Sequence, residues 1–232
     1  MAPTSFRARI ADIRSLTTSV REFVLTFQDP HHLQFLAGQS LAIMVPGTSL
    51  EPPAKRYYSL TSNPKSPAQV SLLVNGADQG KGSRFLLDHK VGDELEVAGP
   101  FGSFQLHDHP DRDVLFVATG TGIAPLRAMI HVLLEQPFQR SLTLYWGLRS
   151  EEDRYFIDEF QALAHQHERF SFSVVLSNAG PQWDGKTGRV TDLIRGIPDV
   201  SDLAVYVCGN RVMVQEVEEL LTGKGPCLIY HE

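Results

Sequence analysis

The sequence predicts two domains of different class, an antiparallel β-barrel of six strands followed by an α/β domain built on a parallel sheet. Up to about residue 106, short alternating or β-branched runs are broken by glycine and proline, which is typical of antiparallel strands in a barrel. After a polar linker at 107–111, short apolar runs alternate with segments of helical periodicity, as in βα units around a parallel sheet. We therefore expect domains at residues 1–106 and 107–232.

The elements follow in order from these patterns. Strands of the first domain are expected at residues 6–10, 22–27, 40–45, 57–60, 69–74 and 94–97, with one helix at 83–89. Strands of the second domain are expected at 114–118, 142–146, 172–176 and 204–208, and helices near 124–135, 153–166, 190–195 and 211–222. Parallel sheets of this kind bind ligands at the carboxyl ends of their strands.

Composition excludes several classes of function. The 232-residue chain has a net charge of −6, which argues against broad nucleic-acid binding, and no stretch suggests a membrane protein. The N-terminus lacks a secretory signal, so we expect a cytoplasmic protein. Neither Cys208 and Cys227 nor the nine histidines show metal-ligand spacing, and no metal is expected. The oligomeric state stays open.

A basic segment stands out within this acidic chain. Residues 55–90 carry six basic residues against two acidic ones, a net charge of +4. Either the charges cluster by chance around one phosphate ligand, or the segment is a docking face for an acidic partner protein.

A glycine turn follows the first strand of the second domain. Gly120 and Gly122 remove side chains that would keep a ligand off the backbone, and Pro125 suits the first turn of the following helix. Free amides at that helix start would face a pyrophosphate. The alternative is a tight strand-to-helix connection that binds no ligand.

A second candidate site lies about sixty residues upstream, in the run 56–62. Arg56 supplies a cation for a phosphate, Tyr57 and Tyr58 supply aromatic faces, and Ser59 supplies a hydrogen-bonding hydroxyl, which are the groups a flavin needs. Residues 80–83 would add amides at a helix start that bind phosphate oxygens, although simple helix capping explains them equally well.

Three motifs occur in a fixed order: Arg-x-Tyr-Ser at 56–59, Gly-Thr-Gly-x-x-Pro at 120–125 and Cys-Gly-x-x-x-Met at 208–213. In these motifs the chain resembles the ferredoxin–NADP reductase superfamily over nearly its whole length. The resemblance implies an FAD-binding barrel at 1–106 and an NAD(P)-binding domain at 107–232, with NADPH or NADH as the co-substrate.

The resemblance also implies roles for individual residues. The FAD contacts would be Arg56 (phosphate), Tyr57, Tyr58 (ring), Ser59 (flavin N5), Val74, Gly80, Lys81, Gly82, Ser83 and Tyr230. The NAD(P) contacts would be Gly120, Thr121, Gly122, Pro125, Arg149, Ser177, Cys208, Gly209 and Met213. Ser59, Cys208 and Glu232 would serve catalysis. A frayed chain end is the alternative for Tyr230 and Glu232.

The coenzyme preference is left open by the sequence. Arg149 could accept a 2′-phosphate, but where NADPH-specific relatives place a serine–arginine pair this chain has Ser177 and Asn178, and acidic residues follow at 151–153.

The implied function is that of an enzyme, an FAD-dependent oxidoreductase that passes electrons from NAD(P)H to a one-electron carrier such as ferredoxin or flavodoxin. Alternatives are an NAD(P)H:flavin reductase that uses free flavin, and the reductase component of an oxygenase. Variants carrying their own plant-type iron–sulfur cluster are excluded, because two cysteines cannot ligate one.

Overall fold

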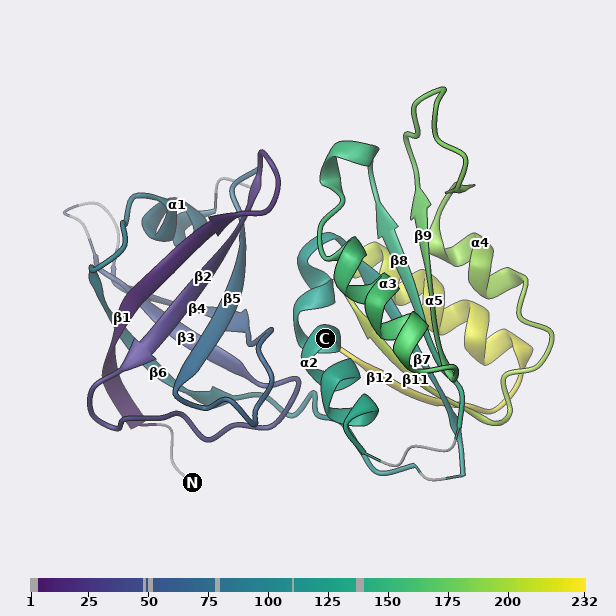
Figure 1. Cartoon of the computed structure of the whole chain (residues 1–232), viewed down its shortest axis with the longest axis horizontal. Helices are drawn as coiled ribbons and strands as arrows, with labels where there is room; N and C mark the ends of the chain where they lie inside the picture. The colour runs from purple at the N-terminus through teal and green to yellow at the C-terminus, as the bar shows by residue number, and fades with distance from the viewer. Residues whose placement is uncertain (1–3, 48, 50–51, 78–79, 110, 137–139) are drawn as a thin grey trace. The chain divides into compact units, whose positions relative to one another are not determined.

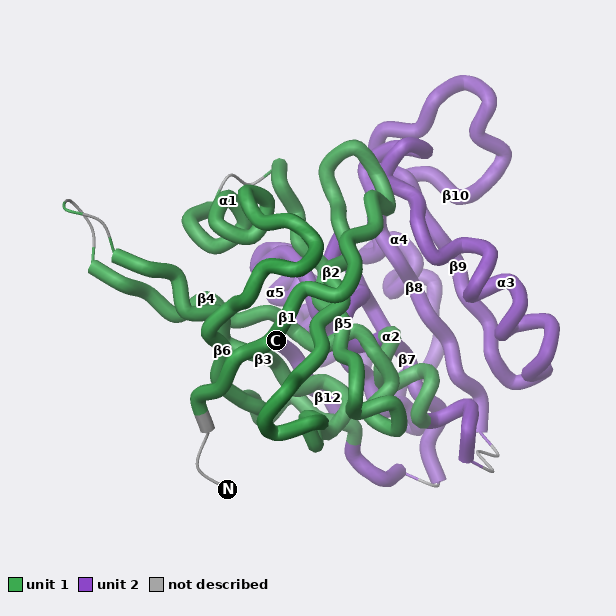
Figure 2. The backbone as a smooth tube through the Cα atoms, turned by 60° about the vertical axis from the view of Figure 1, so that its left-hand side comes forward, with its two compact units in different colours: residues 1–106, 127–132 green, residues 107–126, 133–232 purple. Residues whose placement is uncertain are grey.

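The computed structural model describes residues 4–47, 49, 52–77, 80–109, 111–136 and 140–232 (Figure 1). Residues 1–3 at the N-terminus and Pro110 in the expected linker lie outside the described residues. The chain forms two compact units (Figure 2): unit 1 contains residues 1–106 and 127–132, and unit 2 contains residues 107–126 and 133–232.

Unit 1 is an antiparallel barrel, as the sequence predicts. Its elements are β1 (Thr4–Ser15), β2 (Val20–Phe27), β3 (Ser40–Val45), β4 (Ala54–Ser59), β5 (Gln69–Asn75), α1 (Lys81–Leu87) and β6 (Glu94–Phe101). The strand order is β4-β3-β6-β1-β2-β5, and an antiparallel bridge between Leu60 and Leu72 joins the two ends of the sheet. All six expected strands and the single expected helix are therefore confirmed.

The barrel core comes from the alternating apolar positions of these strands. Ile10 on β1, Phe23 and Leu25 on β2, and Leu41 on β3 are fully buried, and α1 adds the fully buried Leu86. Burial of such side chains fixes the register of these strands, because a slip by one residue would turn the apolar set outward. β4 has no fully buried residue, and its Arg56 and Tyr58 lie against the start of α1.

Unit 2 is a parallel sheet covered by helices, which confirms the predicted class. Its strands are β7 (Asp113–Thr119), β8 (Leu142–Leu148), β9 (Phe170–Leu176), β10 (Lys186–Thr187), β11 (Leu203–Cys208) and β12 (Leu228–His231), in the order β10-β9-β8-β7-β11-β12. Its helical elements are η1 (Gly120–Gly122), α2 (Ile123–Leu134, of which 127–132 belong to unit 1), η2 (Glu151–Asp153), α3 (Ile157–Gln166), α4 (Val190–Arg195) and α5 (Arg211–Lys224). Every strand pair is parallel, so the carboxyl ends lie at one edge.

Two strands of unit 2 were not expected from the sequence. The two-residue β10 is too short to show a pattern, and β12 lies at the extreme C-terminus. Because β12 pairs with β11 from Leu228 to His231, the alternative that the chain ends in a frayed tail is wrong.

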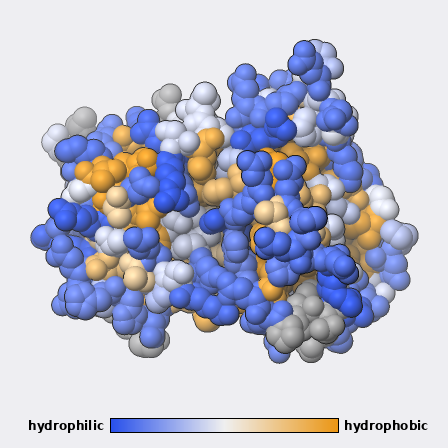
Figure 3. Space-filling view, viewed as in Figure 1, coloured by the Kyte–Doolittle hydropathy of each residue, from blue (hydrophilic) through white to orange (hydrophobic). Residues whose placement is uncertain are grey.

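Hydropathy varies over the surface in small patches, with hydrophilic residues covering most of the face seen in Figure 3. None of the helices in the described ranges is long and apolar enough to cross a membrane. Among those same residues, no group of three or more His, Cys, Asp or Glu side chains could hold a metal ion.

Candidate active site

The expected flavin residues of the barrel converge where β4 meets the start of α1. A Cβ atom on Gly82 would lie 2.7 Å from both Arg56 Cγ and Tyr58 Oη, so only glycine lets the helix start approach these two side chains. Ser83 Oγ donates to the Gly80 carbonyl at 3.0 Å, which fixes the first turn. A cation, a phenol and a helix start therefore share one corner of the barrel, a combination that fits a phosphate-bearing cofactor.

Burial sets the protonation state of the phenol in this corner. Burial raises the pKa of Tyr58 to about 12, and the Arg56 guanidinium opposes only part of that increase. Tyr58 therefore stays protonated at neutral pH and can donate a hydrogen bond. Arg56 donates from Nη1 to the Lys55 carbonyl at 2.9 Å, which uses one of its five donors.

The other expected flavin residues of the barrel occupy different positions. Because side chains alternate along a strand, Tyr57 and Ser59 face away from Arg56 and Tyr58. Tyr57 is 57% exposed, and its ring meets the Phe101 ring edge-on at a centroid distance of 5.3 Å. Val74 is fully buried in the barrel core, so any contact between this residue and FAD would use its backbone.

Two aromatic side chains donate hydrogen bonds to the glycine turn of unit 2. Trp146 Nε1 on β8 and the Tyr155 hydroxyl each donate to the Gly120 carbonyl at 3.1 Å, and both side chains are buried. Gly120 has a φ of 51°, and no described atom lies within 4 Å of the place where its Cβ would be. Gly120 therefore presents an open backbone surface beside Thr121, as a pyrophosphate site requires.

Gly122 has a packing role that the sequence does not indicate. A Cβ on Gly122 would collide with the carbonyl group of Cys208 and would lie 2.7 Å from Gly209 Cα. The contact between the β7 and β11 loops is enough to require a glycine here, and the contact of Gly122 with a coenzyme pyrophosphate stays a prediction. Pro125 lies in the first turn of α2, where its missing N–H costs no hydrogen bond.

The loop after β11 is locked to the loop after β7. Thr119 Oγ1 accepts from the Asn210 N–H at 3.0 Å, and a Cβ on Gly209, whose φ is 148°, would collide with the same oxygen. Met213 is buried on α5 and its methyl group lies under Gly209, so it supports this loop. Asn210 Oδ1 accepts from the Val212 N–H at 2.9 Å and caps α5.

Cys208 and Glu232 come together at the carboxyl ends of β11 and β12. The Glu232 N–H donates to the Val207 carbonyl at 3.1 Å, which continues the pairing of the two strands. Burial, and to a smaller extent the Glu232 carboxylate, raises the pKa of the Cys208 thiol to about 12. The thiol is therefore neutral at physiological pH and serves as a small polarizable group rather than a nucleophile.

Tyr230 has a defined place within unit 2. Its ring stacks on Tyr206 at 4.9 Å and on His107 at 4.5 Å, and its hydroxyl is 3.0 Å from His109 Nε2. His107 N–H in turn donates to the Tyr206 hydroxyl at 2.9 Å. Nothing in the sequence indicates this stack, because residues 107 and 109 have the composition of an ordinary polar linker.

Arg149 and Ser177 lie side by side at the carboxyl ends of β8 and β9. The Ser177 N–H donates to the Leu148 carbonyl at 3.1 Å, and the Asn178 N–H donates to the Arg149 carbonyl at 2.7 Å. Both Arg149 and Ser177 are exposed. Arg149 and Ser177, which are expected to contact the adenosine end of the coenzyme, therefore lie next to each other.

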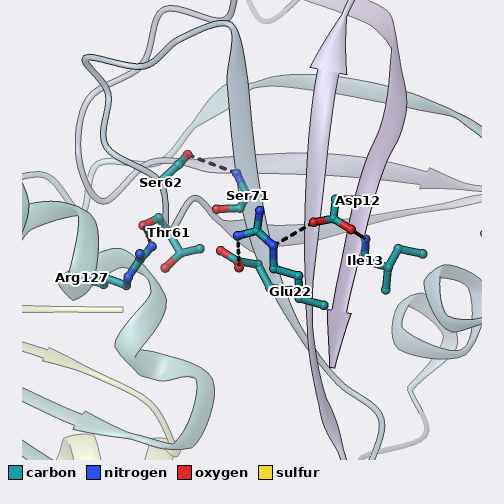
Figure 4. Close-up of polar contacts among 8 residues, drawn as sticks. Asp12, Ile13, Glu22, Thr61, Ser62, Ser71 and Arg127 are labelled. Carbon is teal, nitrogen blue, oxygen red and sulfur yellow. Dashed lines mark hydrogen bonds and ion pairs between the residues drawn. The ribbon is translucent and has the colours of Figure 1, made fainter. Parts of the chain in front are cut away.

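Unit 1 also contains a separate polar cluster that the sequence does not indicate (Figure 4). Glu22 on β2 is 5% exposed and lies directly across from Arg14 on β1, with 3.4 Å between Oε2 and Nη1. Arg14 also pairs with Asp12 at 2.8 Å. The cluster borders a polar cavity of about 290 Å³. Arg127 also lines this cavity and donates a hydrogen bond of 2.9 Å to the Thr61 carbonyl. The alternating apolar pattern of β2 gives no sign of a buried carboxylate.

Comparisons with known proteins match both units. Residues 7–106 match the family model of the oxidoreductase FAD-binding domain, and residues 116–219 match that of the oxidoreductase NAD-binding domain. Ferredoxin–NADP reductase B of Sorangium cellulosum is 36% identical over 228 residues, which are 94% of this chain and 92% of that protein.

Other relatives are longer than this chain. The propane 2-monooxygenase reductase component of Rhodococcus jostii is 30% identical, and the match covers 94% of this chain but 60% of that protein. Among solved structures, the Amycolatopsis cytochrome P450 reductase GcoB superposes with a TM-score of 0.88 at 26% identity, over 99% of this chain and 69% of that one.

Proposed function

The chain belongs to the ferredoxin–NADP reductase superfamily and is an FAD-dependent NAD(P)H oxidoreductase, and from this premise we propose that its electron acceptor is a separate acidic carrier protein of the ferredoxin or flavodoxin type. The observation that carries the FAD assignment is the approach of Gly82 to Arg56 and Tyr58. No side chain beyond hydrogen fits at residue 82, so the helix start and the cation are held as one unit that can bind a phosphate.

The chain's own residues supply placement and electrostatics. FAD, when bound, supplies the chemistry of accepting an electron pair and releasing single electrons. Arg56 and the start of α1 would bind its phosphates, Tyr58 would lie against its ring and Ser59 would offer a hydroxyl to it. Gly120 and Thr121 would bind the coenzyme pyrophosphate, and the neutral Cys208 would floor the nicotinamide site, with Glu232 beside it as the acidic group. Holding two rings in contact supplies most of the rate in such a reaction.

The acceptor would dock on basic residues around β4 and α1. Lys55 and Arg56 lie on β4, and Lys81 and Arg84 lie on α1. Lys81 Nζ donates to the carbonyl of Pro52, two residues before β4, at 2.9 Å. An opposite charge on the carrier would raise its association rate. Raising the salt concentration should therefore slow reduction of a ferredoxin or flavodoxin more than reduction of an uncharged quinone, and equal slowing would refute the docking face.

A second candidate is the reductase component of an oxygenase. The 30% identity with the Rhodococcus jostii reductase favours it, and the same FAD and coenzyme sites would serve. A third candidate is an NAD(P)H:flavin reductase, in which the flavin binds and leaves as a substrate and is not retained as a cofactor. The two cysteines are free thiols, as expected in a reducing compartment, so a cytoplasmic location is part of the proposal and cell fractionation would test it.

The absorption spectrum of the purified protein tests the function directly. We expect bound FAD that NADH or NADPH bleaches anaerobically. Arg56→Ala should lower FAD affinity by about one to two orders of magnitude, since a charge-assisted contact contributes about 1.5–3 kcal/mol. Arg84→Ala, an equal charge change in the last turn of α1, is the matched control and should retain FAD. Unchanged FAD content in Arg56→Ala would refute the site, and a colourless protein that reduces added free flavin would favour the flavin reductase.

A further inference from the structure

The polar cavity of unit 1 lies between two walls. The barrel wall carries Glu22 and Val24 on β2 and Ser71 on β5, which are neighbours because Val24 pairs with Ser71 in the sheet. The α2 wall carries Arg127 and His131, from the part of the helix that belongs to unit 1. The volume of about 290 Å³ is close to the lower end of the range of small-molecule sites, about 300–1,000 Å³. The described lining contains none of the residues assigned above to FAD or the coenzyme.

Two buried polar groups of the barrel wall keep capacity for hydrogen bonds. Glu22 is 5% exposed, and within the described part of the chain its carboxylate has one partner, Arg14, through Oε2 at 3.4 Å. Ser71 is 6% exposed, and although its N–H donates to Ser62 Oγ at 3.1 Å, none of the described residues bonds to its hydroxyl. Buried polar groups in proteins are almost always hydrogen-bonded. A ligand in the cavity would therefore meet a carboxylate oxygen and a hydroxyl that can both accept from it.

The charges of the two walls are opposite in sign. Arg14 Nε lies 2.8 Å from Asp12 Oδ2, a shorter contact than the 3.4 Å between Arg14 and Glu22. This single cation therefore faces two carboxylates, and the three side chains together carry a net charge of −1. On the α2 wall, Arg127 is a permanent cation. A ligand that carries a positive and a negative group would match both walls.

The distance between the walls suits a small molecule (Figure 4). Arg127 Nη1 donates to the Thr61 carbonyl, and the Thr61 N–H donates to the Ser71 carbonyl, each at 2.9 Å, so the guanidinium lies beside β5. Ser71 is one strand across and two residues along from Glu22, which is about 8 Å for strands about 4.8 Å apart and a rise of about 3.3 Å per residue. A molecule of amino-acid size spans such a distance when a hydrogen bond of about 2.9 Å is added at each end.

We propose that this cavity is a binding site for a free α-amino acid. The ammonium group would donate to the Glu22 carboxylate and the Ser71 hydroxyl, and the carboxylate would accept from Arg127. A sugar would bring no anion to Arg127, and a simple carboxylic acid would bring no cation to Glu22, so a zwitterion fits better than either. The lining also contains polar residues that suit a small polar side chain on the ligand, namely Ser62, Asn63, Ser66 and Gln69.

Titration calorimetry of the holoenzyme tests the site, with L-serine and L-glutamine as the probes. We expect a dissociation constant of about 1 mM for at least one of them, as befits a ligand with so few atoms. Acetate and ethanolamine each keep one of the two charged groups and should bind at least about tenfold more weakly than that amino acid. This comparison uses only the wild-type protein, so it does not depend on the folding of any variant.

Three variants locate the binding. Glu22→Gln and Arg127→Gln each remove the charge from one wall, and Arg7→Gln removes an equal charge from an exposed residue of β1 that pairs with Glu94. The first two should weaken amino-acid binding about tenfold or more, and the control should change it less than about twofold, where tenfold corresponds to about 1.4 kcal/mol. A Tm measurement establishes that each variant is folded.

Four results would overturn the inference. The first is that neither amino acid binds at a concentration about twentyfold above 1 mM. The second is that acetate or ethanolamine binds as tightly as the amino acids. The third is an unchanged affinity in folded Glu22→Gln or Arg127→Gln, and the fourth is an equal loss in Arg7→Gln.

Discussion

Replacing Gly122 by alanine should destabilise unit 2 even when no coenzyme is bound. The added Cβ would lie 2.6 Å from the Cys208 carbonyl carbon and 2.7 Å from Gly209 Cα, and every atom it meets belongs to the backbone. Backbone atoms cannot rotate away as side chains do, so the β7 and β11 loops would have to separate. Overpacking costs about 1–3 kcal/mol, and we expect about 2–3 kcal/mol here. Tm should fall by about 5–10 °C, measured by calorimetry on the apoprotein.

Gly120→Asn is the matched control for this prediction. Gly120 has a φ of 51°, which asparagine tolerates better than other side chains, and no described atom lies within 4 Å of its Cβ position. This variant should lose about 1 kcal/mol or less in stability but should raise KM for the coenzyme, because the side chain enters the open face of the turn. If Gly122→Ala has the same Tm as the wild type, or if Gly120→Asn lowers Tm as much as Gly122→Ala does, the reasoning is refuted. Gly122 would then not be required for packing, or Gly120 would not be reserved for ligand access.

Three further predictions follow from the described contacts. Burial raises the pKa of Cys208 from 9.0 to about 12, so iodoacetamide should modify Cys227 first, and equal labelling of the two cysteines would contradict this expectation. For the same reason the free energy of unfolding should decline as the pH rises from about 9 to 12, because in that range the thiol ionises in the unfolded state and not in the folded state. Arg14→Ala should lower the free energy of unfolding by about 1–2 kcal/mol because it leaves the buried Glu22 carboxylate without this ion pair, and adding Glu22→Val should restore much of the loss. A double variant whose loss equals the sum of the losses in the two single variants would contradict this reasoning. Deleting residues 229–232 removes most of β12 and should lower Tm by several degrees as measured by calorimetry, whereas an unchanged Tm would show that β12 adds nothing to unit 2.

The fold and the site are predictable from the sequence where periodicity and motifs coincide. The six barrel strands follow from alternating apolar residues, and the glycine turn and Cys208 follow from motifs at strand ends. The reason for Gly122 could not be read from the sequence, because a glycine that avoids a ligand and one that avoids another loop look identical there. Glu22 is a surface-type residue in its strand, and its burial depends on long-range packing. Likewise, nothing local indicates that Tyr230 stacks on Tyr206.

The two hydrogen bonds that converge on the Gly120 carbonyl have a kinetic consequence. Trp146 and Tyr155 are buried, so their donors keep the turn in one arrangement whether or not a coenzyme is present. A turn that is already ordered loses no conformational entropy when a ligand arrives. Association of the coenzyme with unit 2 should accordingly follow simple second-order kinetics, with an observed rate that rises linearly with concentration and shows no plateau from a slow loop rearrangement.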